Sequence, residues 1–569
     1  MIEKMTKYSW VLLSADREDF LGKLRDLGVV DITRSSKPVD AESAAMLSRI
    51  EQNTALAAML QKGEDAHLAE LRASLASLRS ERAAAAPWGR YDKERLAAFG
   101  IHYYCVPQKK FNPALAGEYP LQVVSEEGGK VWFVILGDET PAGLKEVPAP
   151  ARTLSEYDAL IAGKEKECES YAEELKARKS EIPDLEKAIA KDRSDLSLYL
   201  ASLQAASAAE DTLCIYEGFA PAGEGKRLEK EFESMDGVLC LNAAATSADK
   251  PPIKFRNNRF VRMFEPLTDM YGRPAYDGFD PTPFISVFFL LFFAMCMGDA
   301  GYGIILVIAG LLLKKVKGFA SLAPLVTTLG VATIVVGFFF HTFFSMDMAG
   351  WECIPDGVKK IFVPSKIAGY DGTMVLALVV GVVHLCLAMI VKTVNATKNK
   401  GFLGSLGVWG WTLLIVGGVI VGAFALAGVL DSSMTRIAII VLGIVSALGI
   451  FLLNDLHRNP LLNIGSGLWE TYNTVTGLIG DVLSYLRLYA LGLAGAMLGY
   501  AFNDLAKMAL GDGGAGWIAF ILIVVVGHTL NLAMAALGAF VHPLRLNFLE
   551  FFKNSGYEAA GRKYDPLTK

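Results

Sequence analysis

The sequence predicts an α-helical polytopic membrane domain with eight transmembrane helices, the last two of them long. N-terminal cytoplasmic α+β lobes, joined by an antiparallel coiled-coil stalk, are expected to precede it. Three observations lead to this fold class. Charge is distributed unevenly along the chain, a seven-residue apolar repeat runs through part of the first half, and long apolar stretches fill the second half.

Charged residues are concentrated in the first half of the 569-residue chain. Residues 1–262 hold 36 of the 55 Lys and Arg residues and 42 of the 60 Asp and Glu residues. We therefore expect a water-soluble domain at 1–262 and a transmembrane domain at 263–569. The start, Met1–Met5, carries no long apolar run, so no signal peptide is predicted and the first domain is expected in the cytoplasm.

The composition argues against several classes of function. A net charge of −5, with no basic stripe of interleaved aromatic residues, gives no reason to expect nucleic-acid binding. The cysteines are scattered, odd in number and never spaced as CxxC, so we expect no disulfide framework and no metal site, and no cofactor is indicated. They are Cys105, Cys168, Cys214, Cys240, Cys296, Cys353 and Cys386.

Two βαβ-like fragments and one strand-rich piece build the predicted α/β lobes. The first fragment has a strand at Met5–Ser14, a helix at Asp16–Leu27 and a strand at Val29–Thr33. The second fragment spans Thr212–Asn242. The strand-rich piece consists of His102–Val106 and Val131–Leu136. Small lobes of this kind are more often scaffolds than active sites.

A seven-residue repeat marks the stalk. Every a position is apolar, whereas three of the d positions are charged, which is typical of a coiled-coil seam with one continuous and one interrupted stripe. The a positions are Leu154, Ile161, Cys168, Leu175, Ile182, Ile189, Leu196 and Leu203, and the d positions are Tyr157, Lys164, Tyr171, Arg178, Leu185, Asp192 and Tyr199. Pro183 is expected to kink this helix without ending it, because the repeat resumes in register.

An Ala-, Leu- and Glu-rich segment earlier in the chain is the expected partner of that helix. Its leucines recur at spacings of three and four residues from Leu68 to Leu78, as in an amphipathic helix. We predict an antiparallel hairpin formed by about 41–84 and 153–209. The plain interpretation is a solvated helix bundle, and the functional one is a rigid spacer, which the uninterrupted a positions favour.

Apolar stretches fill the second half of the chain. The first, Pro281–Leu313, is broken by Gly298–Gly301, and a turn there would make it two short helices. The others are Leu322–Phe344, Thr373–Ile390, Leu406–Leu430, Ile437–Leu453, Leu468–Leu510 and Trp517–Phe552. With the turn, eight spans place every positive loop cluster on the side of the soluble half, as the positive-inside rule requires. These clusters contain Lys314, Lys315, Lys317, Lys392, Lys398, Lys400, Arg458, Lys553, Arg562 and Lys563. A re-entrant hairpin is the alternative for the first two helices, because both would be short.

The sixth stretch carries an arginine in an apolar environment. A charged side chain at mid-bilayer costs at least about 2.5–3.5 kcal/mol, so Arg487 needs a partner or a function. Asp481 lies six residues away, which is the wrong spacing for a pair on one helix face. We therefore expect the carboxylate partner of Arg487 on another chain. A snorkelling or structural arginine is the competing interpretation.

The last stretch contains a second arginine and several polar residues. His528, Asn531 and His542 precede Arg545, and Glu550 follows it. Because Arg545 is closer to the end of its stretch, a structural role near the lipid headgroups competes more strongly here.

Six sequence elements resemble subunit a, also called subunit I, of V-type and archaeal-type ATPases, and the resemblance covers essentially the whole chain. They are Ser484–Leu491, His542–Glu550, Asp280–Phe284, Gly298–Gly303, Pro251-Pro252 with Asn257, and Gly381 with His384. Eukaryotic members carry a His and a Glu where this sequence has Gly495 and Ala535, so its half-channel groups must differ. The short length resembles prokaryotic members.

The resemblance implies a membrane stator that carries H⁺ or Na⁺ in a rotary ATPase, with no nucleotide site of its own. The arginine matching Arg487 would face the carboxylates of a proteolipid (c/K) ring between two aqueous half-channels, assisted by Arg545 and Glu550. For the half-channels we expect Asp481, Ser484, Tyr485, His528 and Asn531. Implied partners are the ring, peripheral-stalk subunits, the central-stalk connector, the catalytic head and the lipid bilayer. A prokaryotic plasma membrane with both termini cytoplasmic is implied.

Two functions from other classes fit parts of the sequence. A secondary transporter also needs intramembrane charge, but it is expected to show repeated halves, and no repeat is found across the predicted spans. A membrane-anchored coiled-coil scaffold explains the stalk but not two intramembrane arginines. A self-contained ATPase is disfavoured because the sequence has no Walker A motif.

Overall fold

The computed structural model describes residues 1–34, 39–89, 91, 100–112, 115–137, 141, 144–208, 212–316, 318–352, 354–364, 366–367, 369–452, 460–510 and 514–568. Lys317, Cys353, Arg458 and the last residue of the predicted hairpin, 209, lie outside these described residues. The chain folds into two compact units. The apolar unit consists of residues 1–11 and 217–566, and the hairpin unit consists of residues 12–216 and 567–569.

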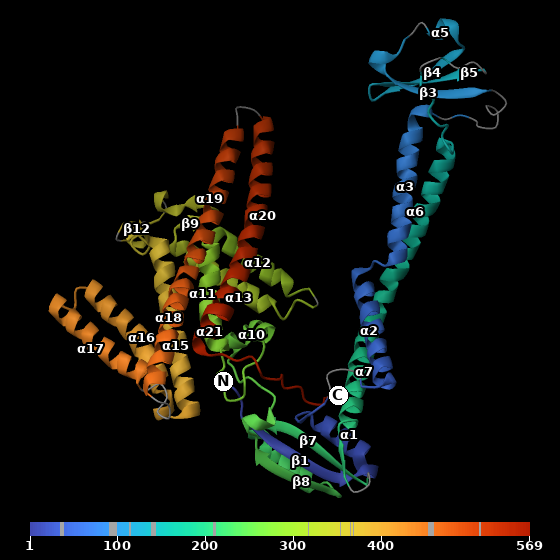
Figure 1. Ribbon diagram of the computed structural model, residues 1–569. Helices are drawn as coiled ribbons and strands as arrows, with labels where there is room; N and C mark the ends of the chain where they lie inside the picture. Colours follow the sequence, from blue (N-terminus) through green and yellow to red (C-terminus); the bar gives the residue numbers. More distant parts are fainter. Residues whose placement is uncertain are drawn as a thin grey trace. The chain divides into compact units, whose positions relative to one another are not determined.

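Four helices dominate the hairpin unit. They are α2 (Ala41–Lys62), α3 (Ala66–Ala85), α6 (Leu154–Ala177) and α7 (Ile182–Ser202). Helix α2 packs along α7, and α3 packs along α6, so the two arms run antiparallel in two consecutive tiers (Figure 1). Buried Leu60, Leu68 and Leu175 form a small core where the tiers meet.

Both arms of the hairpin are interrupted at the same level. Gly63 ends α2 in the left-handed conformation, with φ of 70°. On the other arm, a 3-10 turn at Arg178–Glu181 separates α6 from α7. Pro183 lies in the first turn of α7, where its missing N–H costs nothing. The sequence predicts a kink at Pro183, and the structure has a short 3-10 interruption just before it. The interruption precedes the proline because a proline inside the helix would cost a backbone hydrogen bond.

Two sheets account for most of the predicted strands. The strand-rich piece forms an antiparallel sheet of order β3-β5-β4, with β3 at Ile101–Pro107, β4 at Leu121–Glu127 and β5 at Lys130–Leu136. The two βαβ-like fragments share one sheet of order β2-β7-β1-β8, and β6 pairs with β7. Its strands are β1 (Met5–Leu13), β2 (Asp31–Ile32), β6 (Ala206–Ala208), β7 (Leu213–Pro221) and β8 (Val238–Ala244). The helices of these fragments are α1 (Arg17–Leu27) and α8 (Gly225–Glu233).

Apolar helices make up most of the apolar unit. In chain order they are α11 (Thr282–Met297), α12 (Ala300–Leu313), α13 (Ala323–Phe339), α15 (Gly372–Lys400), α16 (Leu406–Leu426), α17 (Ser432–Phe451), α18 (Pro460–Ser484), α19 (Leu486–Ala509) and α20 (Gly514–Arg545). Within the described residues, five helical segments are long and apolar enough to cross a membrane, the last two spanning Asn463–Ala509 and Gly516–Ser555, and α11, α12 and α13 are shorter. The predicted combination of an N-terminal α+β region and an apolar helical region is confirmed.

The turn predicted at Gly298–Gly301 separates α11 from α12. Gly298 takes the left-handed conformation, with φ of 55°, and the Asp299 carboxylate accepts hydrogen bonds from the backbone N–H groups of Gly301 and Tyr302. The same carboxylate accepts two further N–H bonds, from Phe344 and Ser345. Four backbone donors on one carboxylate identify Asp299 as a structural cap for this turn.

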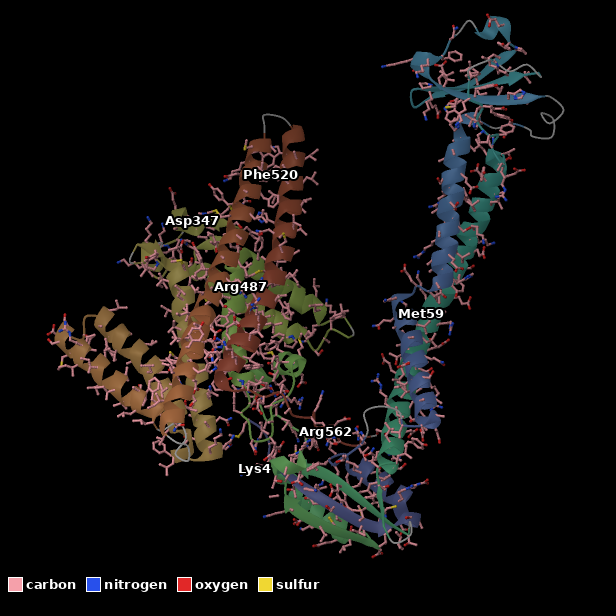
Figure 2. The ribbon with its side chains drawn as sticks, in the orientation of Figure 1. Lys4, Met59, Asp347, Arg487, Phe520 and Arg562 are labelled. Atoms are coloured by element: carbon pink, nitrogen blue, oxygen red, sulfur yellow. The ribbon has the colours of Figure 1, made fainter. Side chains whose placement is uncertain are left out.

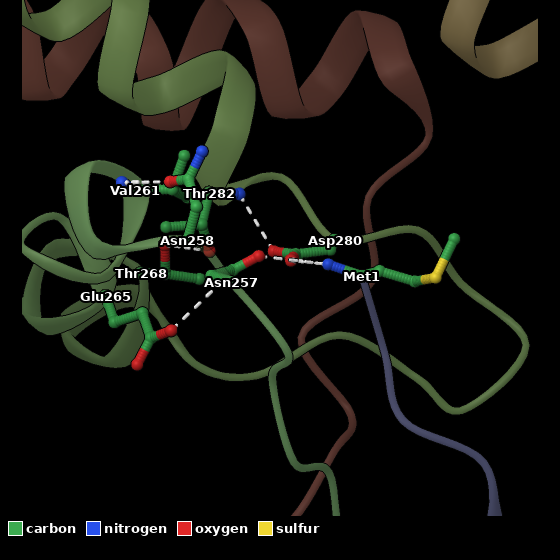
Figure 3. Close-up of polar contacts among 8 residues, drawn as sticks. All are labelled: Met1, Asn257, Asn258, Val261, Glu265, Thr268, Asp280 and Thr282. Atoms are coloured by element: carbon green, nitrogen blue, oxygen red, sulfur yellow. Dashed lines mark hydrogen bonds and ion pairs between the residues drawn. The ribbon is translucent and has the colours of Figure 1, made fainter.

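The segment leading into α11 is tied down by polar side chains (Figure 3). Asn258 caps the short helix α9 (Arg259–Arg262) by accepting from the N–H of Val261. Asp280 accepts from the N–H of Thr282, the first residue of α11, and also from the amino group of Met1. These contacts fix the direction in which α11 begins.

Aromatic side chains form the core around α11. Phe289, Phe292 and Phe293 on this helix are buried against residues of α15, α19 and α20. After α20 come a π-helical turn at Leu546–Phe551 and the short helix α21 (Phe552–Ser555). The region around both arginines is thus built on a rigid aromatic centre.

Candidate functional site

Arg487 lies just after a break between two helices. Helix α18 ends at Ser484 and α19 begins at Leu486, so Tyr485 alone separates them. Around Tyr485 the backbone bonds tighten to i→i+3 spacing, from the Tyr485 N–H to the Val482 carbonyl and from the Leu488 N–H to the Tyr485 carbonyl, each at 3.1 Å. Figure 2 shows Arg487 about midway along the long helices of its unit.

One nitrogen of the Arg487 guanidinium is buried without a hydrogen-bond partner in the described part of the chain. This nitrogen is Nη1, and no ion pair to Arg487 occurs among the described residues. The nearby charged or titratable groups include His542 on α20, which lies within electrostatic reach of both Arg487 and Arg545. A buried donor without a partner is costly, so Nη1 of this half-buried side chain is available to a partner from outside the chain.

Asp481 is engaged elsewhere. Its carboxylate forms an ion pair with Lys553 at 3.4 Å and accepts a hydrogen bond from Asn554 at 2.7 Å, both on α21. The Asp481 side chain is 13% exposed, and that of Lys553 is 60% exposed. The spacing argument against an Asp481–Arg487 pair thus agrees with the contacts that Asp481 makes.

The second arginine opens the π-helical turn. Pro543 lies in the last turn of α20, and the Asn547 side chain donates to the Pro543 carbonyl at 2.9 Å. A π-helix bonds residues five apart, so Glu550 comes to lie one turn from Arg545. Arg545 itself is exposed, whereas Glu550 is 4% exposed and its Oε2 has no partner within the described part of the chain.

Glu550, Ser484 and Asp481 form one polar cluster. Ser484 lies near enough to the Glu550 carboxylate to hydrogen-bond it, and the charged groups of Asp481 and Arg545 lie within electrostatic reach of it. The sequence placed these residues on two stretches more than sixty positions apart, and the pairing of α18–α19 with the end of α20 brings them together. They lie on the α21 side of the helix break, next to the Asp481–Lys553 pair.

His528 and Asn531 belong to a different cluster, farther along α20. The Tyr302 hydroxyl bonds to His528 Nδ1 at 2.8 Å and accepts from Asn531 Nδ2 at 2.8 Å. His528 Nε2 contacts the Asn503 side chain at 3.0 Å. Asn531 Nδ2 also donates to the carbonyl of Gly495 at 2.9 Å. A polar chain across α12, α19 and α20 results.

Two cavities flank Arg487 along the α18–α19 axis. One, of about 260 Å³, is lined by α18 residues from Glu470 to Asp481 and is bordered by Lys392 and Lys553. The other, of about 220 Å³, is lined by α19 residues from Leu488 to Ala496. In sequence, Arg487 lies between the two sets of lining residues.

Tyr485 lines neither of these two cavities. Its side chain is fully buried, and its hydroxyl bonds to His384 on α15 at 2.9 Å. Sequence reasoning missed the partners that complete these clusters. They are Tyr302, Asn503, His384, Lys553 and Asn554. Three of them belong to sequence patterns, Lys553 as a loop charge and His384 and Tyr302 as parts of motifs.

A family model matches residues 147–351 and 468–569, more than half of the chain, and it describes the V-type ATPase 116kDa subunit family. This chain belongs to that family. Both arginine-bearing segments and the turn at Gly298 fall inside the matched residues, as the resemblance of those motifs suggested.

Curated relatives agree with the family. The chain is 31% identical to the A-type ATP synthase subunit I of Methanocaldococcus jannaschii, over 74% of this chain and 64% of that protein. It is 33% identical to the A-type ATP synthase subunit I of Pyrococcus horikoshii, over 60% of this chain and 52% of that protein. It is 26% identical to V-type ATP synthase subunit I 1 of Treponema pallidum, over 100% of both chains. The chain therefore matches between about half and the full length of these relatives.

Proposed function

We propose that this chain is the membrane stator subunit of a rotary V/A-type ATPase. It forms ion half-channels against a proteolipid ring and couples H⁺ or Na⁺ movement to ATP hydrolysis or synthesis. The observation that carries this proposal is Arg487, a guanidinium with a buried, unpartnered Nη1 inside an apolar helical unit. Family membership and the names of the relatives support it.

A ring carboxylate supplies what Arg487 lacks. As each ring site passes, the permanently charged guanidinium lowers the pKa of that carboxylate and favours release of the bound ion. The same positive charge repels cations, so ions do not leak directly from one half-channel to the other. Asp481 does not compete for Arg487, because Lys553 and Asn554 already hold it.

The two cavities support an offset pair of half-channels. Asp481, Ser484 and Glu550 line the cytoplasmic half-channel, next to the cavity of about 260 Å³. His528 and Asn531, with Tyr302, form the polar path on the other side of Arg487. Tyr485 orients the arginine, and Arg545 assists near the cytoplasmic boundary.

Topology follows from the helices and the loop charges. In the proposed topology the three shorter apolar helices cross the membrane as well as the five long apolar segments of the described residues, which gives eight spans with both termini in the cytoplasm. This arrangement keeps Lys314, Lys398 and Lys553 on one side of a prokaryotic plasma membrane. Within the apolar unit, the ion-translocating part is proposed to begin at residue 263.

The helical hairpin serves as a coiled-coil stalk that contacts the peripheral-stalk subunits. Its a positions from Leu154 to Leu196 are buried or half-buried, and only Leu203 is exposed. A stator must resist the torque of the ring, and a long two-helix arm suits that task. The central-stalk connector and the catalytic head are the remaining partners of the complex.

The test is ATP-driven ion uptake by reconstituted complexes, normalised to assembled complex. We expect Arg487→Ala to assemble but to lose about a hundredfold in uptake, because losing a buried ion pair costs about 3 kcal/mol. Arg436→Ala is the matched control, since Arg436 is an exposed arginine on α17 of the same unit. Near-normal uptake with Arg487→Ala would refute the proposal.

A further inference from the structure

His384 on α15 lies at the centre of the aromatic core. It is fully buried, its ring stacks on Phe551 at 4.8 Å between centroids and an angle of 7°, and it packs on Phe288 at 4.2 Å. Its Nδ1 bonds to the Tyr485 hydroxyl at 2.9 Å, and its Nε2 has no partner within the described residues. A phenylalanine would pack equally well here, so the polar ring must serve the one hydrogen bond it makes.

Tyr485 needs that bond because of its place in the backbone. It is the single residue between α18 and α19, and Arg487 follows two residues later. The orientation of the Tyr485 side chain therefore sets where the first turn of α19 begins. Because the Tyr485 hydroxyl is hydrogen-bonded and its ring is enclosed, the first turn of α19 is held in one position.

Gly381 makes room for the tyrosine ring. A Cβ added to Gly381 would come within 2.3 Å of Tyr485 Cγ and within 2.7 Å of Cδ1. No side chain fits at that separation, so α15 approaches the helix break directly only because residue 381 is glycine. Gly381 and His384 lie three residues apart on one face of α15, and together they form the surface against which Tyr485 packs.

The same histidine reaches the second arginine segment. Phe551, on which its ring stacks, is the last residue of the π-helical turn that begins directly after Arg545 and contains Glu550. One face of α15 thus contacts both irregular backbone segments of the site, at Tyr485 and at Phe551.

We propose that Gly381 and His384 position Arg487 relative to Arg545 and Glu550, with Tyr485 and Phe551 as the two points of attachment. This inference rests on the proposed function of Arg487. It assigns the α15 residues no contact with the ion. They act through the helix break and the π-helical turn.

The experiment measures backbone hydrogen exchange of the full chain in lipid nanodiscs, together with uptake by assembled complexes. Tyr485→Phe and His384→Phe each remove the hydrogen bond and keep the ring packing. In each single variant we expect hydrogen exchange at 482–488 to rise about tenfold and ion uptake to fall about tenfold. A tenfold change corresponds to the net free energy of about one hydrogen bond. The double variant should be no worse than either single variant, because both remove one bond.

Two further variants separate positioning from general stability. Gly381→Ala removes no polar group, yet it should displace Tyr485 and give the same loss of uptake. Tyr500→Phe removes a hydroxyl from an exposed position on α19 and should change neither exchange nor uptake. His384→Ala, which also loses the stacking, should raise exchange at 546–551 as well.

Unchanged exchange and uptake with both Tyr485→Phe and Gly381→Ala would overturn the inference, even if His384 variants fail to fold. Additive losses in the double variant would also overturn it. These outcomes are distinct from failure of the proposed function. Normal uptake with Arg487→Ala would refute ion coupling at Arg487 while leaving the exchange results intact.

Discussion

The hairpin unit and the apolar unit use arginine in opposite ways. Across the hairpin, arginines pair with acidic residues of the opposite arm at 2.5–2.7 Å, and the side chains of all these arginines are about half exposed. The pairs are Arg49–Asp192, Arg79–Glu165 and Arg82–Asp158. In water each contributes about 0.2–1 kcal/mol, so the hairpin spreads a small stabilisation over many contacts. In the apolar unit Arg487 has no such partner within the described residues, so the cost of an unpaired charged group is concentrated in one residue.

Helix interruptions differ in the same way. In the hairpin, Asp40 and Asp65 cap α2 and α3, and each carboxylate also accepts a hydrogen bond from a tyrosine of the opposite arm, Tyr199 or Tyr171. In the apolar unit, the break at Tyr485 and the π-helical turn are held by buried aromatic and histidine contacts. The interruptions of the solvated hairpin add contacts between its two arms. Those of the apolar unit lie next to Arg487 and Arg545 and so determine the direction of these charged side chains.

The largest expected effect compares the two arginines of the site. Arg487→Lys should reduce ATP-driven ion uptake about a hundredfold, because an ammonium lacks the planar fork and loses its proton more readily when desolvated. Arg545→Lys should keep most of the uptake, since Arg545 is exposed and water can solvate either cation. Both variants are measured in reconstituted vesicles at equal amounts of assembled complex. Equal losses of uptake would show that the half-buried Arg487 and the exposed Arg545 have the same function.

An intermediate effect is expected at Asp481. Asp481→Asn removes the charge that pairs with Lys553 and that borders the cavity of about 260 Å³. We expect uptake to fall about tenfold, as for the loss of one charge-assisted hydrogen bond, with assembly unchanged because Lys553 stays solvated. Asp504→Asn is the control, since Asp504 pairs with Lys507 on the surface of α19. Unaltered uptake in Asp481→Asn would remove Asp481 from the ion path.

Periodicity and charge in the sequence predicted much of this architecture. The alternation of strand and helix near the N-terminus, the a-position repeat and the turn at Gly298–Asp299 depend on neighbours in sequence, and such signals can be read directly. The isolated Arg487 stood out for the same reason, because a charge in an apolar stretch is rare.

The assembled site could not be predicted in this way. The bond between Tyr302 and His528 joins residues 226 positions apart, and that between His384 and Tyr485 joins residues 101 apart. The π-helical turn is equally hidden, because α-helical spacing puts Arg545 and Glu550 on different faces. Tyr485 was expected at a half-channel, yet its hydroxyl points to α15, a direction that only tertiary packing determines.

The smallest expected effect concerns the acidic caps of the hairpin. Hydrogen bonds from Ser43 and Tyr199 lower the pKa of Asp40 to about 2, and those from Tyr171 and Leu68 lower the pKa of Asp65. Because both folded-state pKa values are depressed, the stabilisation by these carboxylates is complete above their ordinary pKa of about 3.9. The contribution of Asp40 is lost as the pH falls from about 4 toward 2, and that of Asp65 is lost as the pH falls below about 4. The pKa of each tyrosine partner is raised, so its contribution is lost only as the pH rises above about 10.

We therefore expect constant protection of the first turns of α2 and α3 from pH 5 to pH 9 and a loss of protection below pH 4. The measurement is hydrogen exchange of the full chain, corrected for the intrinsic pH dependence of exchange. Asn retains the capping geometry but carries no charge, so the Asp40→Asn/Asp65→Asn variant should show little of the acid loss. Asp184→Asn, at an exposed acid in the first turn of α7, should keep all of it. The contradicting result is a loss of protection in acid that is as large in the double variant as in the unmodified chain. That result would mean that the acid sensitivity of the hairpin comes from its surface ion pairs and not from the caps at Asp40 and Asp65.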